Sequence, residues 1–250
     1  MPTFATPDPI TACIEASAGS IRITASDRSD TVVDVRPRDE SRPADVRSAE
    51  GARVEYANGK LAVSPAKFGF LGYRMGAVEI VIELPSRSRV QVAVASADAQ
   101  ADGEFADFRF DSASGRLDVQ SISGTAKIAT ASGDAAIADV NGNMKFQAAS
   151  GSLSLDRMRG HVKSQTASGS VSVGAAVRGG VVAHTSSGDV EVGIPEGTAA
   201  ELDIMTGSGS VTNRLQPSAG PEQGDDTVVV EVLSGSGDVD IHRALNAPAR

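Results

Sequence analysis

The chain has 250 residues, with 7 Phe, 2 Tyr, no Trp and 26 Gly, and its formal net charge is −9. This acidic balance argues against a general nucleic-acid binder. The single cysteine excludes a disulfide within the chain and a zinc site built from several cysteines. No apolar run approaches the roughly 18 residues of a membrane-spanning helix, so we expect no membrane span.

The first ten residues hold three prolines and lack the basic-then-apolar pattern of a secretory signal, so we expect a cytoplasmic protein. Residues 10–95 are rich in apparent β-strands but do not follow the nine-residue period found further along the chain, and almost no helix is expected. Asn58-Gly59 separates two apolar runs and predicts a hairpin. Residues 37–50 are charged and contain two prolines, which predicts an exposed loop. The expected strands are 10–16, 19–25, 31–36, 52–56, 60–64, 78–84 and 89–95.

The segment 67–76 combines glycines with large apolar side chains. Such a loop either plugs the end of a fold or contacts a partner or membrane surface, because exposed apolar patches mark interfaces. Both interpretations stay open at this stage. The candidate contact residues in this segment are Phe68, Phe70, Leu71, Tyr73 and Met75.

A repeated motif, Ser-Gly followed by an alternating strand, dominates the second half of the chain. Its glycines are Gly115, Gly133, Gly151, Gly169, Gly188, Gly209 and Gly237, and the first four are 18 residues apart. A second series lies halfway between them, at Gly124, Gly142, Gly160 and Gly179. The basic period is therefore nine residues, with two alternating kinds of turn. We expect each glycine to supply a tight turn before a strand.

Apolar residues recur two, four and seven positions after each glycine. Gly115 is followed in this way by Leu117, Val119 and Ile122, and Gly142 by Met144, Phe146 and Ala149. Counting back nine residues places Phe108, Phe110 and Ala113 in the same pattern. The alternation of the first two positions is typical of a half-buried strand.

These periods predict an all-β protein, a parallel β-solenoid whose 18-residue coils each hold two short strands. The predicted organisation is a β-rich cap at 1–95 that is continuous with the solenoid, repeats at 96–242, and a flexible tail at 243–250. A calcium-binding β-roll needs an Asp in every turn. Only Asp134, Asp189 and Asp238 follow the motif glycines, so we expect no metal site and no cofactor.

One cation recurs on the outward side of every coil. Arg109, Lys127, Lys145 and Lys163 are each 18 residues apart, so stacked coils would align them about 5 Å from one another. This row is the main candidate contact for an acidic partner surface or polymer. The alternative interpretation is that these cations keep an exposed sheet soluble. The serines before the motif glycines have no accompanying base, so no catalytic residue is predicted.

The pattern resembles the bacterial β-strand-repeat "putative adhesin" family of unknown function, whose relatives are toast-rack and head-GIN domains. The resemblance is carried by Gly-Ser-Ile-Arg-Ile (19–23), Thr-Val-Val-Asp-Val (31–35), Ile-Glu-Leu-Pro (82–85) and seven copies of the Ser-Gly motif. It covers about residues 10–242. It implies a β-solenoid without catalytic residues, and an association with the bacterial cell envelope.

The sequence therefore predicts a non-enzymatic scaffold or adhesin-like interaction protein that presents a regular surface to an unidentified protein or acidic glycan. One alternative is a polysaccharide-acting β-helix enzyme, which would need a pair of carboxylates or a carboxylate with a cation. Another is a self-assembling homo-oligomer. In that case, the last coil, with Val228 to Val232 as its strand, would be uncapped.

Overall fold

A computed structural model describes residues 1–65, 76–216, 220 and 224–244. It divides into two compact units, residues 1–123 and 124–250. The fold is all-β and β-solenoid-like. The predicted boundary at residues 95 and 96 stays a prediction.

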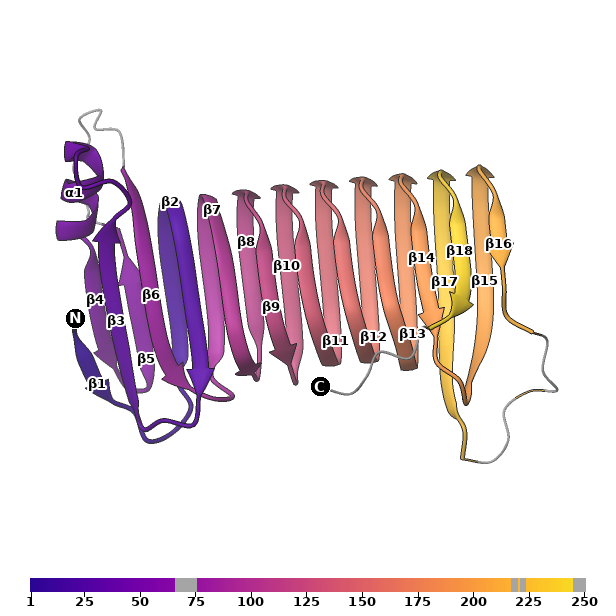
Figure 1. Ribbon diagram of the computed structural model, residues 1–250, viewed down its shortest axis with the longest axis horizontal. Helices are drawn as coiled ribbons and strands as arrows, with labels where there is room; N and C mark the ends of the chain where they lie inside the picture. The colour runs from indigo at the N-terminus through magenta and orange to yellow at the C-terminus, as the bar shows by residue number, and fades with distance from the viewer. Residues whose placement is uncertain (66–75, 217–219, 221–223, 245–250) are drawn as a thin grey trace. The chain divides into compact units, whose positions relative to one another are not determined.

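Unit 1 is built around one long strand, β2 (Thr11–Ser26), which lies between β7 on one side and β5 and β6 on the other (Figure 1). The first half of β2 pairs in parallel with β5 and with β7, and its second half pairs with β6 and again with β7. The chain's first long strand is therefore an inner strand. The strands are β1 (Thr3–Ala5), β2 (Thr11–Ser26), β3 (Asp30–Pro37), β4 (Arg53–Ala57), β5 (Lys60–Ser64), β6 (Ala77–Pro85), β7 (Arg89–Phe105), β8 (Phe108–Ser114) and β9 (Leu117–Ile122).

Antiparallel strands close the outer side of β5 and β6. β3 pairs antiparallel with β6, β1 with β3, and β4 with β5. Asn58 and Gly59 connect β4 and β5 with φ values of 51° and 73°. Two successive positive φ values are the backbone of a type I′ turn, so the predicted hairpin is confirmed.

The predicted loop at 37–50 is wrong in its second part, because Pro43–Glu50 forms helix α1. Pro43 stands in its first turn, where a missing N–H is tolerated. Asp45 is buried and accepts a hydrogen bond from the Ala77 N–H at 3.0 Å. Ser48 accepts another from the Gly76 N–H at 2.8 Å. Contacts distant in the sequence thus stabilise a helix that has no apolar periodicity to predict it.

Unit 2 stacks parallel strands in the register that the repeat predicts. Thr125 pairs with Asn143 and Ala135 with Leu153, 18 residues further along in each case. A register shift after Met158 absorbs the first insertion of one residue. The strands are β10 (Thr125–Ser132), β11 (Ala135–Ser150), β12 (Leu153–Ser168), β13 (Val171–Ser187), β14 (Val190–Ile194), β15 (Thr198–Ser208), β16 (Val211–Asn213), β17 (Asp226–Ser236) and β18 (Val239–Arg243).

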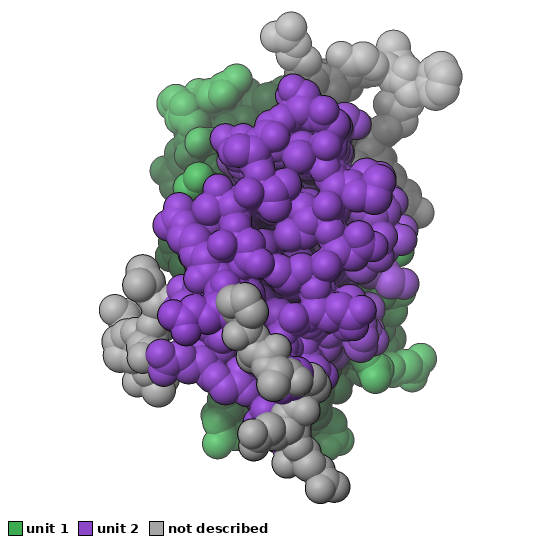
Figure 2. All heavy atoms as spheres, turned by 90° about the vertical axis from the view of Figure 1, so that its right-hand side faces the viewer, with its two compact units in different colours: residues 1–123 green, residues 124–250 purple. Residues whose placement is uncertain are grey.

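The final strands of unit 2 do not follow chain order. β17 pairs with β13 on one side and with β15 on the other, and β18 pairs with β14 and β16 in the same way. The expectation that Val228 to Val232 form an uncapped last coil is therefore wrong. Among the described residues, β15 and β16 are the end layer, and this end of unit 2 faces the viewer in Figure 2.

The core consists of the inward residues that the alternation predicts. Phe108, Phe110, Leu117, Met144 and Phe146 are all buried. The seventh position is buried only after one of the two turns. Ile122, Val140 and Met158 are inside, whereas Ala113 and Ala149 are exposed. After the other kind of turn, the buried side chain is the sixth after the glycine and not the seventh. Thr166, six residues after Gly160, and Thr185, six residues after Gly179, are both buried.

The glycines of unit 2 are required by close packing between layers as well as by turns. A Cβ on Gly169 would lie 2.1 Å from the carbonyl oxygen of Gly151, and one on Gly142 would lie 2.1 Å from that of Gly124. Neither glycine has a positive φ, so space alone excludes a side chain there. At Gly160 the φ of 126° adds a conformational requirement.

Candidate partner-binding surface

Three of the predicted cations form a straight row within unit 2. Lys127 pairs in register with Lys145, and Lys145 with Lys163. All three side chains are exposed, and the residues beside them along each strand are buried. Neighbouring strands lie about 4.8 Å apart, so the row has one positive charge per layer. Its role in binding stays a prediction.

The fourth predicted cation, Arg109, belongs to unit 1. It lies on β8 opposite Gln91 of β7. Its guanidinium Nε donates to Asp111 at 2.6 Å, and this hydrogen bond raises the pKa of Arg109 above its usual value. Arg109 therefore already has a carboxylate partner, which distinguishes it from the three lysines.

The lysine row is flanked by neutral polar side chains on the same surface. The Gln147 amide donates to Gln165 at 3.3 Å, and Asn143 pairs in register with His161 on the other side of the row. Within the described part of unit 2, none of the three lysines has an ion-pair partner. Adjacent ammonium groups repel by up to about 1 kcal/mol in water, so an added anion would relieve this repulsion.

Further along the stack, the same row passes from basic to apolar and then to acidic side chains. Lys163 pairs with Val182, Val182 with Glu231, and Glu231 with Asp203. We call this outward surface of unit 2 the lysine face. Its central row is Lys127, Lys145, Lys163, Val182, Glu231 and Asp203. One flanking row is Thr125, Asn143, His161, Gly180, Val229 and Glu201, and the other is Ala129, Gln147, Gln165, His184, Leu233 and Met205.

Sequence reasoning did not find the acidic and apolar part of this face. The alternation of Val229, Glu231 and Leu233 does mark them as outward residues of a strand. Their place next to Val182 could not be inferred, because it depends on β17 inserting between β13 and β15. The repeat predicts layers in chain order, and the repeat spacing does not encode this exchange.

The predicted contacts Phe68, Phe70, Leu71, Tyr73 and Met75 lie outside the described residues. Their role as a plug or as a contact stays a prediction.

The residues after the motif glycines form a ladder that holds successive layers together. Asp134 accepts a hydrogen bond from the Ser152 N–H, and Asp238 accepts one from the Ser210 N–H at 2.8 Å. Asp189 accepts in turn from the Asp238 N–H. The bonds from the Ser210 N–H and hydroxyl lower the pKa of Asp238. These acids therefore cap the turns between layers.

Within the described part of unit 2, Ser172, Glu191 and His242 form a hydrogen-bonded set. Glu191 accepts from the Ser172 hydroxyl at 3.4 Å and lies 3.1 Å from His242 Nε2. A nucleophilic triad needs the histidine between the hydroxyl and the acid. Here the acid stands between the other two, so the histidine has no path to the serine proton.

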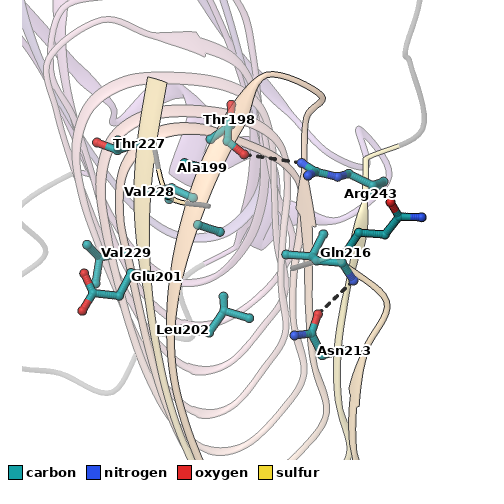
Figure 3. A pocket seen from close by; sticks show the side chains of 13 residues that line it. Thr198, Ala199, Glu201, Leu202, Asn213, Gln216, Thr227, Val228, Val229 and Arg243 are labelled. Atoms are coloured by element: carbon teal, nitrogen blue, oxygen red, sulfur yellow. Dashed lines mark hydrogen bonds between the residues drawn. The ribbon is translucent and has the colours of Figure 1, made fainter. Parts of the chain in front are cut away.

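A pocket of about 580 Å³ opens at the end of unit 2, beside β15 (Figure 3). Leu202 and Val228 line it together with polar groups, and Arg243 donates to the Thr198 carbonyl at 3.4 Å. Glu201 is the single carboxylate among the described lining residues. The described lining therefore lacks the pair of carboxylates that a glycosidase uses, although Glu201 and Arg243 are a carboxylate and a cation in the same pocket.

In the part of the chain that the structure describes, no three His, Cys, Asp or Glu side chains are arranged to hold a metal ion. No helix among the same residues is long and apolar enough to cross a membrane.

The family model described as Toastrack DUF4097 matches residues 13–242. The chain belongs to this family. The match includes both units and all of the Ser-Gly repeats, and it confirms the resemblance found in the sequence. No curated protein matches the chain.

Two solved structures are similar to this Toastrack chain. One is described as a "putative adhesin" from Bacteroides fragilis, with 11% identity and a TM-score of 0.56, covering 96% of this chain and 95% of that one. The other is a "putative cell adhesion protein" from Clostridium sporogenes, with 12% identity and a TM-score of 0.25, covering 97% and 98% of the two chains. The first shows that the fold is shared.

Proposed function

We propose that this Toastrack protein is a non-catalytic, adhesin-like interaction module that binds an acidic partner through the lysine row. The observation that carries the proposal is the register of Lys127, Lys145 and Lys163. Three exposed cations stand in consecutive layers of a packed sheet, and none of them has a described counter-ion. The description of a structural relative as an adhesin supports a binding role.

The rigidity of the stack determines what such a row recognises. Lys145 and Lys163 each lie on a strand that is paired on both sides, and Lys127 lies on a strand that is paired with the strand of Lys145. The backbone therefore holds each lysine at a fixed position. The conformational freedom lost on binding is then limited to the lysine side chains. A linear anionic polymer or an acidic protein surface with charges spaced at about the 4.8 Å layer distance would meet all three ammonium groups. Arg109 of unit 1 is a proposed fourth contact.

The test uses a linear anionic polysaccharide, such as heparin or polygalacturonate, as the probe. The triple variant Lys127→Ser, Lys145→Ser, Lys163→Ser is compared with wild type at several salt concentrations. Loss of three weak ionic contacts should lower the affinity by about tenfold or more, and the remaining binding should depend less on salt.

A matched control separates the row from the overall charge. The variant Arg22→Ser, Lys60→Ser, Arg116→Ser removes three exposed cations at other positions. We expect it to retain affinity within about threefold of wild type. Equal losses in the two triple variants would show that only net charge matters, and the proposed contact row would be wrong.

A further inference from the structure

The lysine face is bipolar along its stack. Its central row begins with three cations, passes through Val182, and ends with Glu231 and Asp203. Glu231 lies 3.5 Å from His184 Nε2. Glu201 adds a third carboxylate in the last layer. Opposite charges are thus separated along one surface of one unit.

The acidic half of this face also carries exposed apolar side chains. Val229 is 48% exposed, Leu233 47% and Met205 62%. These are three of the five large hydrophobic residues that are exposed in the described part of the chain. Leu233 and Met205 are neighbours in one flanking row, and Val229 lies in the other. Exposed apolar residues on one face indicate a contact surface, and the acids between the two rows favour a partner with cations.

The face contains the cations that its own acidic half requires. Two copies can meet face to face about a two-fold axis that lies in the interface plane. With the axis along the stack, each layer meets itself and Lys145 faces Lys145. With the axis along the strands at Val182, the layer order reverses. Lys163 then faces Glu231 of the second copy, and Lys145 faces Asp203 of the second copy.

We propose that two copies of this chain associate through the lysine face, with the two-fold axis passing at Val182. The proposal rests on the proposed function, because it names a second copy as the acidic partner of the same lysine row. Like charges oppose the first orientation, and complementary charges select the second. Lys127 lies beyond the last acidic layer of the partner in this arrangement.

The size of the face predicts a weak dimer. The five layers from Lys145 to Asp203 overlap in this arrangement, and at about 4.8 Å per layer with roughly 20 Å of strand across they give about 500 Å² on each copy. The total of about 1,000 Å² is at the lower limit for specific protein interfaces. We therefore expect a concentration-dependent dimer that dissociates more easily as salt is added.

The test measures the mass of the full chain by sedimentation equilibrium, from about 10 μM to about 1 mM at low salt. Wild type should show a monomer–dimer equilibrium. Lys163→Glu and Glu231→Lys should each weaken it about tenfold or more, because each brings like charges together. The double variant Lys163→Glu, Glu231→Lys should restore it to within about threefold of wild type.

Lys127→Glu is the matched control, because it makes the same charge change on the same row outside the proposed contact. We expect it to weaken the dimer clearly less than Lys163→Glu does, because position 127 faces no carboxylate of the second copy. A wild type that stays monomeric at the highest concentration would overturn the proposal. So would a double variant that fails to recover, or a Lys127→Glu variant that weakens association as much as Lys163→Glu.

Polysaccharide binding distinguishes this inference from the proposed function. If the wild type is monomeric but binds the anionic polymer through the three lysines, the self-association is wrong and the proposed function stands. If the dimer forms as described and the polymer does not bind, the acidic partner is the second copy alone. Lys127→Glu and Lys163→Glu should weaken polymer binding equally, in contrast to their different effects on the dimer.

Discussion

Both units insert a strand from near a chain terminus between two other strands, but the ends of their stacks differ. In unit 1, β2 lies between β6 and β7, and in unit 2, β17 lies between β13 and β15. In both units a segment near a chain terminus is therefore inside the stack. Unit 1 then adds antiparallel strands and helix α1 outside β5 and β6. In the described part of unit 2, no antiparallel strand covers β15.

Inserting a terminal segment between two strands and covering the end of a stack with further elements are therefore two independent features of this fold. Insertion gives the terminal segment two strand partners, so it is held on both sides. Capping protects unpaired strand edges and apolar ends from other chains. The described residues of unit 2 show the first without the second, and the exposed Met205, Val229 and Leu233 lie on the strands nearest the end of the described stack. A bipolar face on such a stack is suited to binding.

The largest expected effect comes from the glycine stack of unit 2. Gly169→Ala places a Cβ 2.1 Å from the Gly151 carbonyl oxygen, so one layer must shift against the next. We expect the free energy of unfolding in urea to fall by about 3 kcal/mol. Gly19→Ala should have a similar effect in unit 1, since its Cβ would lie 1.8 Å from the Val78 carbonyl oxygen.

The neighbouring substitution Ser168→Ala controls for this prediction, because that side chain is exposed. It should change the stability by less than about 0.5 kcal/mol. If Gly169→Ala were equally harmless, the layers could not be in the described contact.

A smaller effect is expected from the cap of unit 1. Asp45→Ala removes the buried acceptor of the Ala77 N–H and leaves that donor unpaired. The expected loss is about 2 kcal/mol in the same unfolding measurement. Asp45→Asn keeps an acceptor oxygen and should lose less than Asp45→Ala. Equal stability of wild type and Asp45→Ala would mean that helix α1 does not secure β6.

The smallest effect concerns the turn ladder of unit 2 and depends on pH. Hydrogen bonds from Ser210 lower the pKa of Asp238 below 3.8 in the folded state. The carboxylate therefore stabilises the fold above pH 3.8, and this contribution is lost as the pH falls through the lowered pKa. Asp238→Asn should be slightly less stable than wild type at pH 7, and the difference should vanish in acid. Denaturant titrations at pH 7 and at successively lower pH measure it, and a difference that grows in acid would contradict the sign.

The sequence predicted local features and missed those that depend on distant contacts. The Asn58-Gly59 hairpin and the in-register lysines follow from turn chemistry and from a fixed period, which act within one or two layers. Helix α1 was missed because its stability comes from Asp45 and Ser48 binding the backbone before β6. The exposed Ala149 shows that the alternation shifts at one kind of corner. The acidic half of the lysine face was missed because no spacing reveals which strand inserts between two others.

Val182, Glu231 and Asp203 occupy three successive layers of the lysine face. Engineered cysteine pairs test this order most directly, in a background that carries Cys13→Ser. Adjacent layers bring Cα atoms within the roughly 4.4–6.8 Å range of a disulfide, whereas alternate layers are about 10 Å apart. We predict that Val182→Cys cross-links with Glu231→Cys, that Glu231→Cys cross-links with Asp203→Cys, and that Val182→Cys does not cross-link with Asp203→Cys. Efficient cross-linking of the last pair would place β15 directly on β13 and contradict the account.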